Sequence, residues 1–285
     1  MAIQNESFIL QSRHGNRRYL SDVRYERNGL GKPVLLFIHG FKGFKDWGYF
    51  NLMADHICRS GFVMVKTNLS HNGTTPEDPL NFADLEAFGH NNYSIELDDI
   101  EDVLNHIEGQ GFPVAREEMD LDQIYLMGHS RGGGISIVKA SEDSRIKKLV
   151  TWASVPSLTS VMPIEALGQW KEAGVHYIFN SRTKQEMPLY YQIAEDYLAN
   201  EDRLDVLKCE SNLNIPHLIV HGDNDETVPV GAARAIYGKS QLGQLCLIQG
   251  GDHVLGGTHP FKVSDLPPHA LSALRTTVEF LQAGL

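Results

Sequence analysis

The chain has 285 residues, of which 42% are hydrophobic and 21% are charged, and its formal net charge is −11. This composition is typical of a globular protein that is large enough to bury a core, so neither metals nor disulfides are needed for folding. The negative charge, together with the absence of any Lys/Arg run, argues against nucleic acid or an anionic membrane surface as a partner.

The cysteines and the N-terminal residues indicate the cellular compartment in which the protein is expected. Cys58, Cys209 and Cys246 are odd in number and widely spaced, which indicates free thiols in a reducing compartment. The opening MAIQNESFIL has no basic start followed by a long apolar run. No stretch of about 18 apolar residues occurs. We therefore expect a cytoplasmic protein without a membrane span.

Short β-branched runs alternate with amphipathic helical patterns along the chain, which predicts a mostly parallel sheet covered by helices. The first expected element is an antiparallel pair of strands over 7–27 with its turn at 14–16. Further strands are expected over 34–38, 62–65, 124–127, 148–152, 215–220 and 245–248. Helices are expected after 46 and over 94–108, 135–139 and 230–237, with a closing helix over 271–281.

One segment, over 156–214, breaks this alternation. Its pattern is helical, and it is long for a connection inside a compact domain. It carries the aromatic residues Trp170, Tyr177, Tyr190, Tyr191 and Tyr197. We interpret it as a helical cap inserted into a single domain that spans 1–285. The alternative is a packed side lobe with no role in substrate choice.

Acidic residues gather at the start of the helix expected over 94–108. Glu96, Asp98 and Asp99 lie in its first turns, where the helix dipole favours negative charge. The alternative is an active site made of paired carboxylates. Acidic residues are, however, common at helix N-termini because of the helix dipole alone.

The main chemical signal is the pattern G-x-S-x-G at Gly128, Ser130 and Gly132. It lies where an apolar strand ends and a helix begins, which is the context that a nucleophilic serine on a sharp turn requires. The lysine of a phosphate-binding P-loop is absent, and so is the glycine spacing of a dinucleotide site. We predict that Ser130 is the nucleophile, against the alternative of a glycine-rich loop without catalytic value.

An oxyanion hole needs two backbone N–H groups that point to one place. Arg131 follows the nucleophile and is expected to supply one of them, and Phe41 in His39-Gly40-Phe41 is expected to supply the other. We assign Trp47 and His129 to substrate binding. Plain packing is the alternative for Trp47, and packing or support of neighbouring groups is the alternative for His129, which lies inside the turn.

The base and the acid are expected after two later strands. His253 follows the last strand and is the predicted base, with His259 in reserve. Asp225 is the predicted acid, with Asp223 as the alternative, and it would hold the imidazole in the correct tautomer. A metal site from His39, His221, His253 and His259 is conceivable. No HExxH or comparable spacing supports it, so we predict no metal.

These motifs together resemble the α/β-hydrolase superfamily, in particular its dienelactone-hydrolase and prolyl-oligopeptidase-like serine esterase branch. The residues that carry the resemblance are His39-Gly40-Phe41, Gly128-His129-Ser130-Arg131-Gly132, His221-Gly222-Asp223-Asn224-Asp225 with Val228-Pro229, and Gly251-Asp252-His253. The chain order Ser130, Asp225, His253 is also the order of that superfamily. The resemblance implies an α/β-hydrolase fold with an eight-stranded, mostly parallel sheet, and no cofactor.

One loop departs from the resemblance. Many relatives carry an Arg-Gly-His-Gly type of turn after the fourth strand, whereas this chain has Asn-Leu-Ser-His-Asn-Gly over 68–73. Substrate contacts of that loop therefore cannot be transferred to this chain.

The function expected from these residues is serine hydrolysis of small acyl or aromatic carboxylic esters through an acyl-enzyme. Peptidase, amidase and thioesterase activities use the same machinery and remain alternatives. A non-catalytic ligand-binding relative is the rival from another class. The expected partner is a small-molecule ester, and a homodimer is left open.

Overall fold

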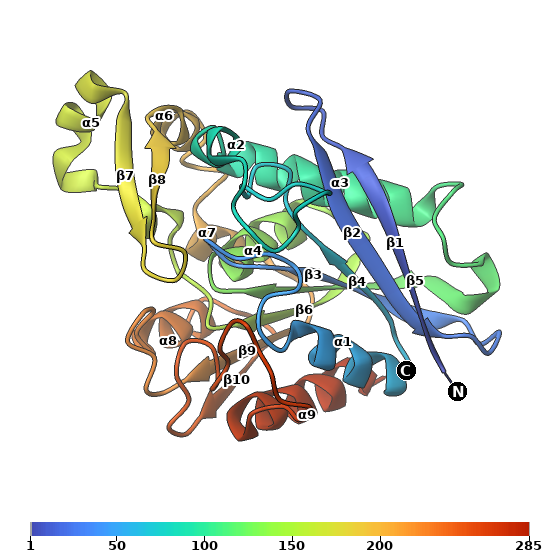
Figure 1. Cartoon of the computed structure of the whole chain (residues 1–285). Helices are drawn as coiled ribbons and strands as arrows, with labels where there is room; N and C mark the ends of the chain where they lie inside the picture. Colours follow the sequence, from blue (N-terminus) through green and yellow to red (C-terminus); the bar gives the residue numbers. More distant parts are fainter. Residues whose placement is uncertain (1, 285) are drawn as a thin grey trace.

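The computed structural model describes residues 2–284 and has an eight-stranded sheet between layers of helices (Figure 1). The strands, in spatial order, are β1 (Ile3–Gln11), β2 (Arg18–Glu26), β4 (Val63–Thr67), β3 (Lys32–Ile38), β5 (Met119–His129), β6 (Ile146–Trp152), β9 (His217–Gly222) and β10 (Gly243–Ile248). The pairs β1–β2 and β2–β4 are antiparallel, and the other neighbouring pairs are parallel. The predicted mostly parallel sheet with an antiparallel start is confirmed.

Helices cover both faces of this sheet. Strand β3 is buried along its whole length, with Val34 and Leu36 in the core on one face and Leu35 and Phe37 in the core on the other. Helices α1 (Phe50–Arg59) and α9 (Pro268–Gln282) pack on the second face, whereas α3 (Tyr93–Glu108), α4 (Arg131–Glu142) and α8 (Gly231–Tyr237) pack on the first. Burial on both sides explains why the central strands are continuous apolar runs.

The remaining helices are short or lie in loops. Helix α2 (Leu85–Gly89) precedes α3, and a 3-10 turn over Arg116–Glu118 precedes β5. None of the helices within residues 2–284 combines the length and the apolar character needed to cross a bilayer.

The segment between β6 and β9 is not purely helical, which corrects the expectation for 156–214. Its elements are 3-10 turns over Leu158–Val161 and Ile164–Ala166, α5 (Leu167–Ala173), β7 (Val175–Asn180), β8 (Gln185–Tyr190), α6 (Gln192–Ala199) and α7 (Val206–Asn212). Strands β7 and β8 form a separate antiparallel hairpin, which stands at one end of the molecule in Figure 1. Tyr177 and Tyr190, read as part of a helical pattern, lie on these strands. The run Val175–Asn180 is rich in β-branched and aromatic residues, which favour strands.

The carboxyl ends of the central parallel strands meet at one edge of the sheet, and helix α4 starts there with very little space. A Cβ atom at Gly132 would lie 2.3 Å from the His39 carbonyl oxygen and 2.7 Å from that of Ile38. Real Cβ atoms do not approach backbone this closely, so the first turn of α4 can rest against the end of β3 only with glycine at position 132. This contact fixes the residue before it in the helix, Arg131, and the turn at Ser130.

We predict that Gly132→Ala lowers the stability of the protein by about 1–3 kcal/mol, because the methyl group forces α4 away from β3. Gly168→Ala is the matched control, because a Cβ at Gly168 in α5 meets nothing within 4 Å. Thermal or urea unfolding of the two variants measures the difference. Equal stability of both variants would show that the contact between α4 and β3 is not tight.

Candidate active site

Ser130 stands on a strained turn between β5 and α4. Its backbone angles are φ 57° and ψ −124°, a conformation that residues other than glycine rarely adopt. The neighbouring strand holds the turn in place, since the Ser130 N–H donates to the Trp152 carbonyl at 2.9 Å. The Gly133 N–H donates to the Ser130 carbonyl at 2.9 Å. The predicted sharp strand-to-helix turn is confirmed.

The imidazole of His253 lies between Ser130 and Asp225. Its Nε2 atom is 3.1 Å from Ser130 Oγ, and its Nδ1 atom is 2.8 Å from Asp225 Oδ2. The ionised carboxylate only accepts hydrogen bonds, so Nδ1 carries the proton of a neutral ring and Nε2 is free to accept the serine proton. The structure therefore brings together the three side chains that the sequence placed after three different strands.

The carboxylate of Asp225 is buried, and both of its oxygen atoms have polar partners. Its Oδ1 atom accepts the N–H groups of Thr227 and Val228 at 2.9 and 2.8 Å, and the His221 Nε2 atom lies 3.3 Å from Oδ2. Burial alone raises the pKa of Asp225, but the hydrogen bonds from His221, His253 and Val228 outweigh it and hold this pKa below its ordinary value. Asp225 is therefore ionised at neutral pH.

Asp223, the alternative acid, points elsewhere. It is exposed, and its Oδ1 atom accepts the Gly250 N–H at 2.6 Å. The geometry therefore favours Asp225 as the partner of His253.

Two buried histidines support the site without titrating near neutral pH. His39 accepts the Leu69 N–H at Nε2 (3.3 Å) and lies 2.9 Å from the Gly40 carbonyl through Nδ1, and burial lowers its pKa to about 4. His129 is 9% exposed and donates from Nε2 to the His253 carbonyl at 3.0 Å. Burial, followed by the neighbouring His253, lowers the pKa of His129 to about 3. His39 thus holds the start of the loop at Leu69, and His129 holds the backbone of the loop that carries His253.

His259, the reserve base, is used elsewhere. Its Nδ1 atom accepts the Gly48 N–H at 3.0 Å, and its ring stacks on Trp47 at 6.1 Å. Within residues 2–284 no group of three or more His, Cys, Asp or Glu side chains is arranged to hold a metal ion.

The loop after β3 passes very close to Ser130. A Cβ at Gly40 would lie 2.9 Å from Ser130 Cβ, so only glycine lets this loop pass so close. Within residues 2–284, neither the Phe41 N–H nor the Arg131 N–H donates to another protein group. Both amides thus remain available to an oxyanion beside Ser130.

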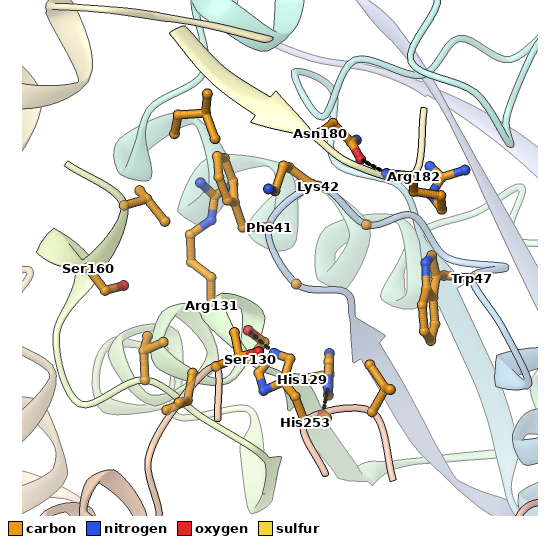
Figure 2. Close-up of a pocket in the computed structure, with 18 of the residues that line it drawn as sticks. Phe41, Lys42, Trp47, His129, Ser130, Arg131, Ser160, Asn180, Arg182 and His253 are labelled. Carbon is orange, nitrogen blue, oxygen red and sulfur yellow. Dashed lines mark hydrogen bonds between the residues drawn. The ribbon is translucent and has the colours of Figure 1, made fainter. Parts of the chain in front are cut away.

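Ser130 and His253 open into a cavity of about 660 Å³. Trp47 and His129 line it, as do side chains of the segment between β6 and β9, namely Ser160, Val161, Ile178, Asn180, Ser181 and Arg182. Figure 2 shows Ser130, His129 and His253 together on one side of this cavity and Phe41 and Lys42 on the neighbouring loop. A volume of this size accommodates a small organic ligand.

The sequence model for the alpha/beta hydrolase fold matches residues 33–177 of this chain. The chain belongs to the alpha/beta hydrolase family. No curated protein matches it. The finer branch predicted from the motifs, that of dienelactone hydrolases and prolyl-oligopeptidase-like esterases, stays a prediction.

Solved structures of other proteins resemble this chain over most of its length. Est1E from Butyrivibrio proteoclasticus is 17% identical over 96% of both chains with a TM-score of 0.65. The alpha/beta hydrolase GrgF from a Penicillium species is 14% identical over 98% of both chains with a TM-score of 0.67. The esterase domain of a Rhodothermus marinus protein is 14% identical over 89% of this chain and 91% of that one, with a TM-score of 0.59. At these identities the likeness shows a shared fold.

Sequence reasoning missed one pair in this alpha/beta hydrolase site. Glu96 is buried and forms an ion pair with Arg131, whose guanidinium lies 4.4 Å from the centre of the Phe41 ring. Asp99 is also fully buried, where it accepts hydrogen bonds from Ser12 and from the Ser70 N–H. Glu96 lies in the first turn of α3 as expected, and both acids also have specific partners within the core. The pairing of Glu96 joins residues 35 positions apart, and no local pattern signals it.

We predict that Asp225→Asn lowers kcat on an activated ester by about 10³–10⁴-fold, because an amide cannot stabilise the imidazolium and can donate to Nδ1 in the wrong tautomer. Asp223→Asn is the matched control and should change kcat by less than about threefold. Steady-state kinetics on p-nitrophenyl acetate compare them. A comparable loss in the control variant would mean that the acid has been misassigned.

Proposed function

We propose that this alpha/beta hydrolase is a serine esterase that cleaves small acyl or aromatic carboxylic esters. The observation that carries the proposal is the hydrogen-bonded series Ser130–His253–Asp225 beside two unused backbone amides. A ligand-binding protein has no need for this arrangement, so the non-catalytic alternative is disfavoured. Haloalkane dehalogenation would require a carboxylate nucleophile, and position 130 is a serine.

In the proposed reaction, His253 Nε2 takes the proton of the Ser130 hydroxyl while Oγ attacks the ester carbonyl. The Phe41 and Arg131 amides stabilise the oxyanion, and the dipole of α4 adds to this stabilisation. The imidazolium then gives its proton to the leaving alcohol, and the acyl group stays on Oγ. Water repeats the sequence with the same base and releases the acid.

The segment between β6 and β9 acts in this proposal as a cap that shapes the acyl-binding region. The support is that Ile178, Asn180 and Arg182 line the same cavity as Ser130. Trp47 and His129 are proposed to contact the substrate, since both line the cavity. His129 is the more buried of the two, and its main contribution is to hold the His253 loop.

We predict that p-nitrophenyl esters of graded acyl length are hydrolysed and that Ser130→Ala lowers kcat by about 10⁴–10⁶-fold, since the base and the oxyanion amides lose their nucleophile. Matched amide and thioester substrates, measured beside the esters, distinguish the peptidase and thioesterase alternatives. Thermal unfolding of the variant confirms that it is folded. Full activity of folded Ser130→Ala would refute the proposed mechanism.

A further inference from the structure

The charges around the cavity differ from those of the whole protein. The chain has 36 acidic and 25 basic residues. Among residues 2–284, however, no Asp or Glu lines the cavity, whereas Lys42, Arg131 and Arg182 do. Arg131 is neutralised by its ion pair with Glu96. The other two cations lie in an acid-free cavity of an acidic protein, which favours an anionic ligand there.

Lys42 is half-buried and has no carboxylate partner within the described residues. The contact of its ammonium group is with the Phe41 ring, whose centre is 5.8 Å from Nζ. Burial lowers the pKa of Lys42 because the charged form loses solvation. In Figure 2 the ammonium group points toward the side of the cavity that holds Phe41 and Arg131. A bound anion would replace the solvation that this group has lost.

The backbone at Lys42 is also strained, since its φ is +52°. Glycine and asparagine adopt this conformation at lower cost than lysine. The turn is closed by the Gly43 N–H, which donates to the Gly40 carbonyl at 3.1 Å. The lysine therefore sits at a fixed place, directly after the proposed oxyanion amide of Phe41.

Arg182 is the second cation and comes from the turn of the β7–β8 hairpin. Its guanidinium lies 5.5 Å from the ring centres of Phe44 and Phe82, and its buried Nη2 atom has no hydrogen-bond partner within the described residues. Burial lowers the pKa of Arg182 as well. No carboxylate among residues 2–284 compensates this charge, so Arg182 adds to the positive potential of the cavity.

We infer that the cavity selects esters whose acyl part carries a carboxylate, and that Lys42 binds this carboxylate. The inference rests on the proposed ester hydrolysis and specifies its substrate class. A single ammonium group beside an aromatic ring suits a singly charged anion. The inference assigns the anion to the acyl side of the scissile bond, and the reaction at Ser130 is unchanged.

The test compares the mono-p-nitrophenyl ester of adipic acid with its neutral primary-amide isostere, p-nitrophenyl adipamate. We expect kcat/KM of the wild type to be about tenfold higher for the carboxylate substrate. This ratio corresponds to about 1.4 kcal/mol, the order of magnitude of a hydrogen bond to a charged group. Lys42→Gln should bring the ratio of the two kcat/KM values close to one. Lys42→Arg should retain most of the preference, because it keeps the charge.

Lys184→Gln is the matched control. Lys184 is an exposed lysine with φ +61° outside the cavity lining, so its replacement tests loss of a strained-backbone lysine without loss of the proposed contact. The ratio should stay at its wild-type value in this variant. A wild-type ratio of one or less overturns the inference. So does a ratio that Lys42→Gln leaves unchanged, or one that Arg182→Gln removes while Lys42→Gln does not.

Failure of the proposed hydrolysis has a different signature. If the wild type cleaves neither these two esters nor the graded p-nitrophenyl esters, esterase function is refuted, and binding of monomethyl adipate and methyl adipamate to the wild type by calorimetry then tests the cavity directly. Binding of monomethyl adipate that is stronger than binding of methyl adipamate and is weakened by Lys42→Gln supports the inference. Equal binding of the two, or no binding of either, overturns it.

Discussion

The site depends on how closely the first turn of α4 approaches the ends of β3 and β6. Gly132 rests against the last carbonyls of β3, and the Ser130 amide is bonded to Trp152 at the end of β6. These contacts hold Ser130 at a positive φ, a conformation that costs on the order of 1–3 kcal/mol and persists only when the surroundings fix it. The turn thereby places the Ser130 hydroxyl at the amino-terminal end of α4.

Loops that follow other strands of the sheet bring further groups close to Ser130. Gly40 lets the loop after β3 pass close to Ser130, and the loop after β10 brings His253 within 3.1 Å of its hydroxyl. The buried carboxylate of Asp225 accepts hydrogen bonds from the Thr227 and Val228 amides and from His253 Nδ1. It can therefore remain charged beside the imidazole of His253.

The sequence predicts most of this arrangement because its signals are local. Buried parallel strands are continuous apolar runs, and the glycines around Ser130 mark a turn that few other residues allow. The hairpin over 175–190 was wrongly expected to be helical, because its strands are short and their aromatic residues fit either period. The pairing of Glu96 with Arg131 and the positions of Lys42 and Arg182 in one cavity depend on tertiary contacts. Periodicity carries no information about such contacts between distant residues.

The central claim is that His253 activates Ser130, and covalent labelling tests it most directly. The wild type should react with a fluorophosphonate, and mass spectrometry of the digested protein should find the adduct on Ser130. Folded His253→Gln, which keeps the same serine, should react at least about 100-fold more slowly because it has lost its general base. An unlabelled wild type, an adduct on another residue, or an equal labelling rate in the variant would contradict the claim.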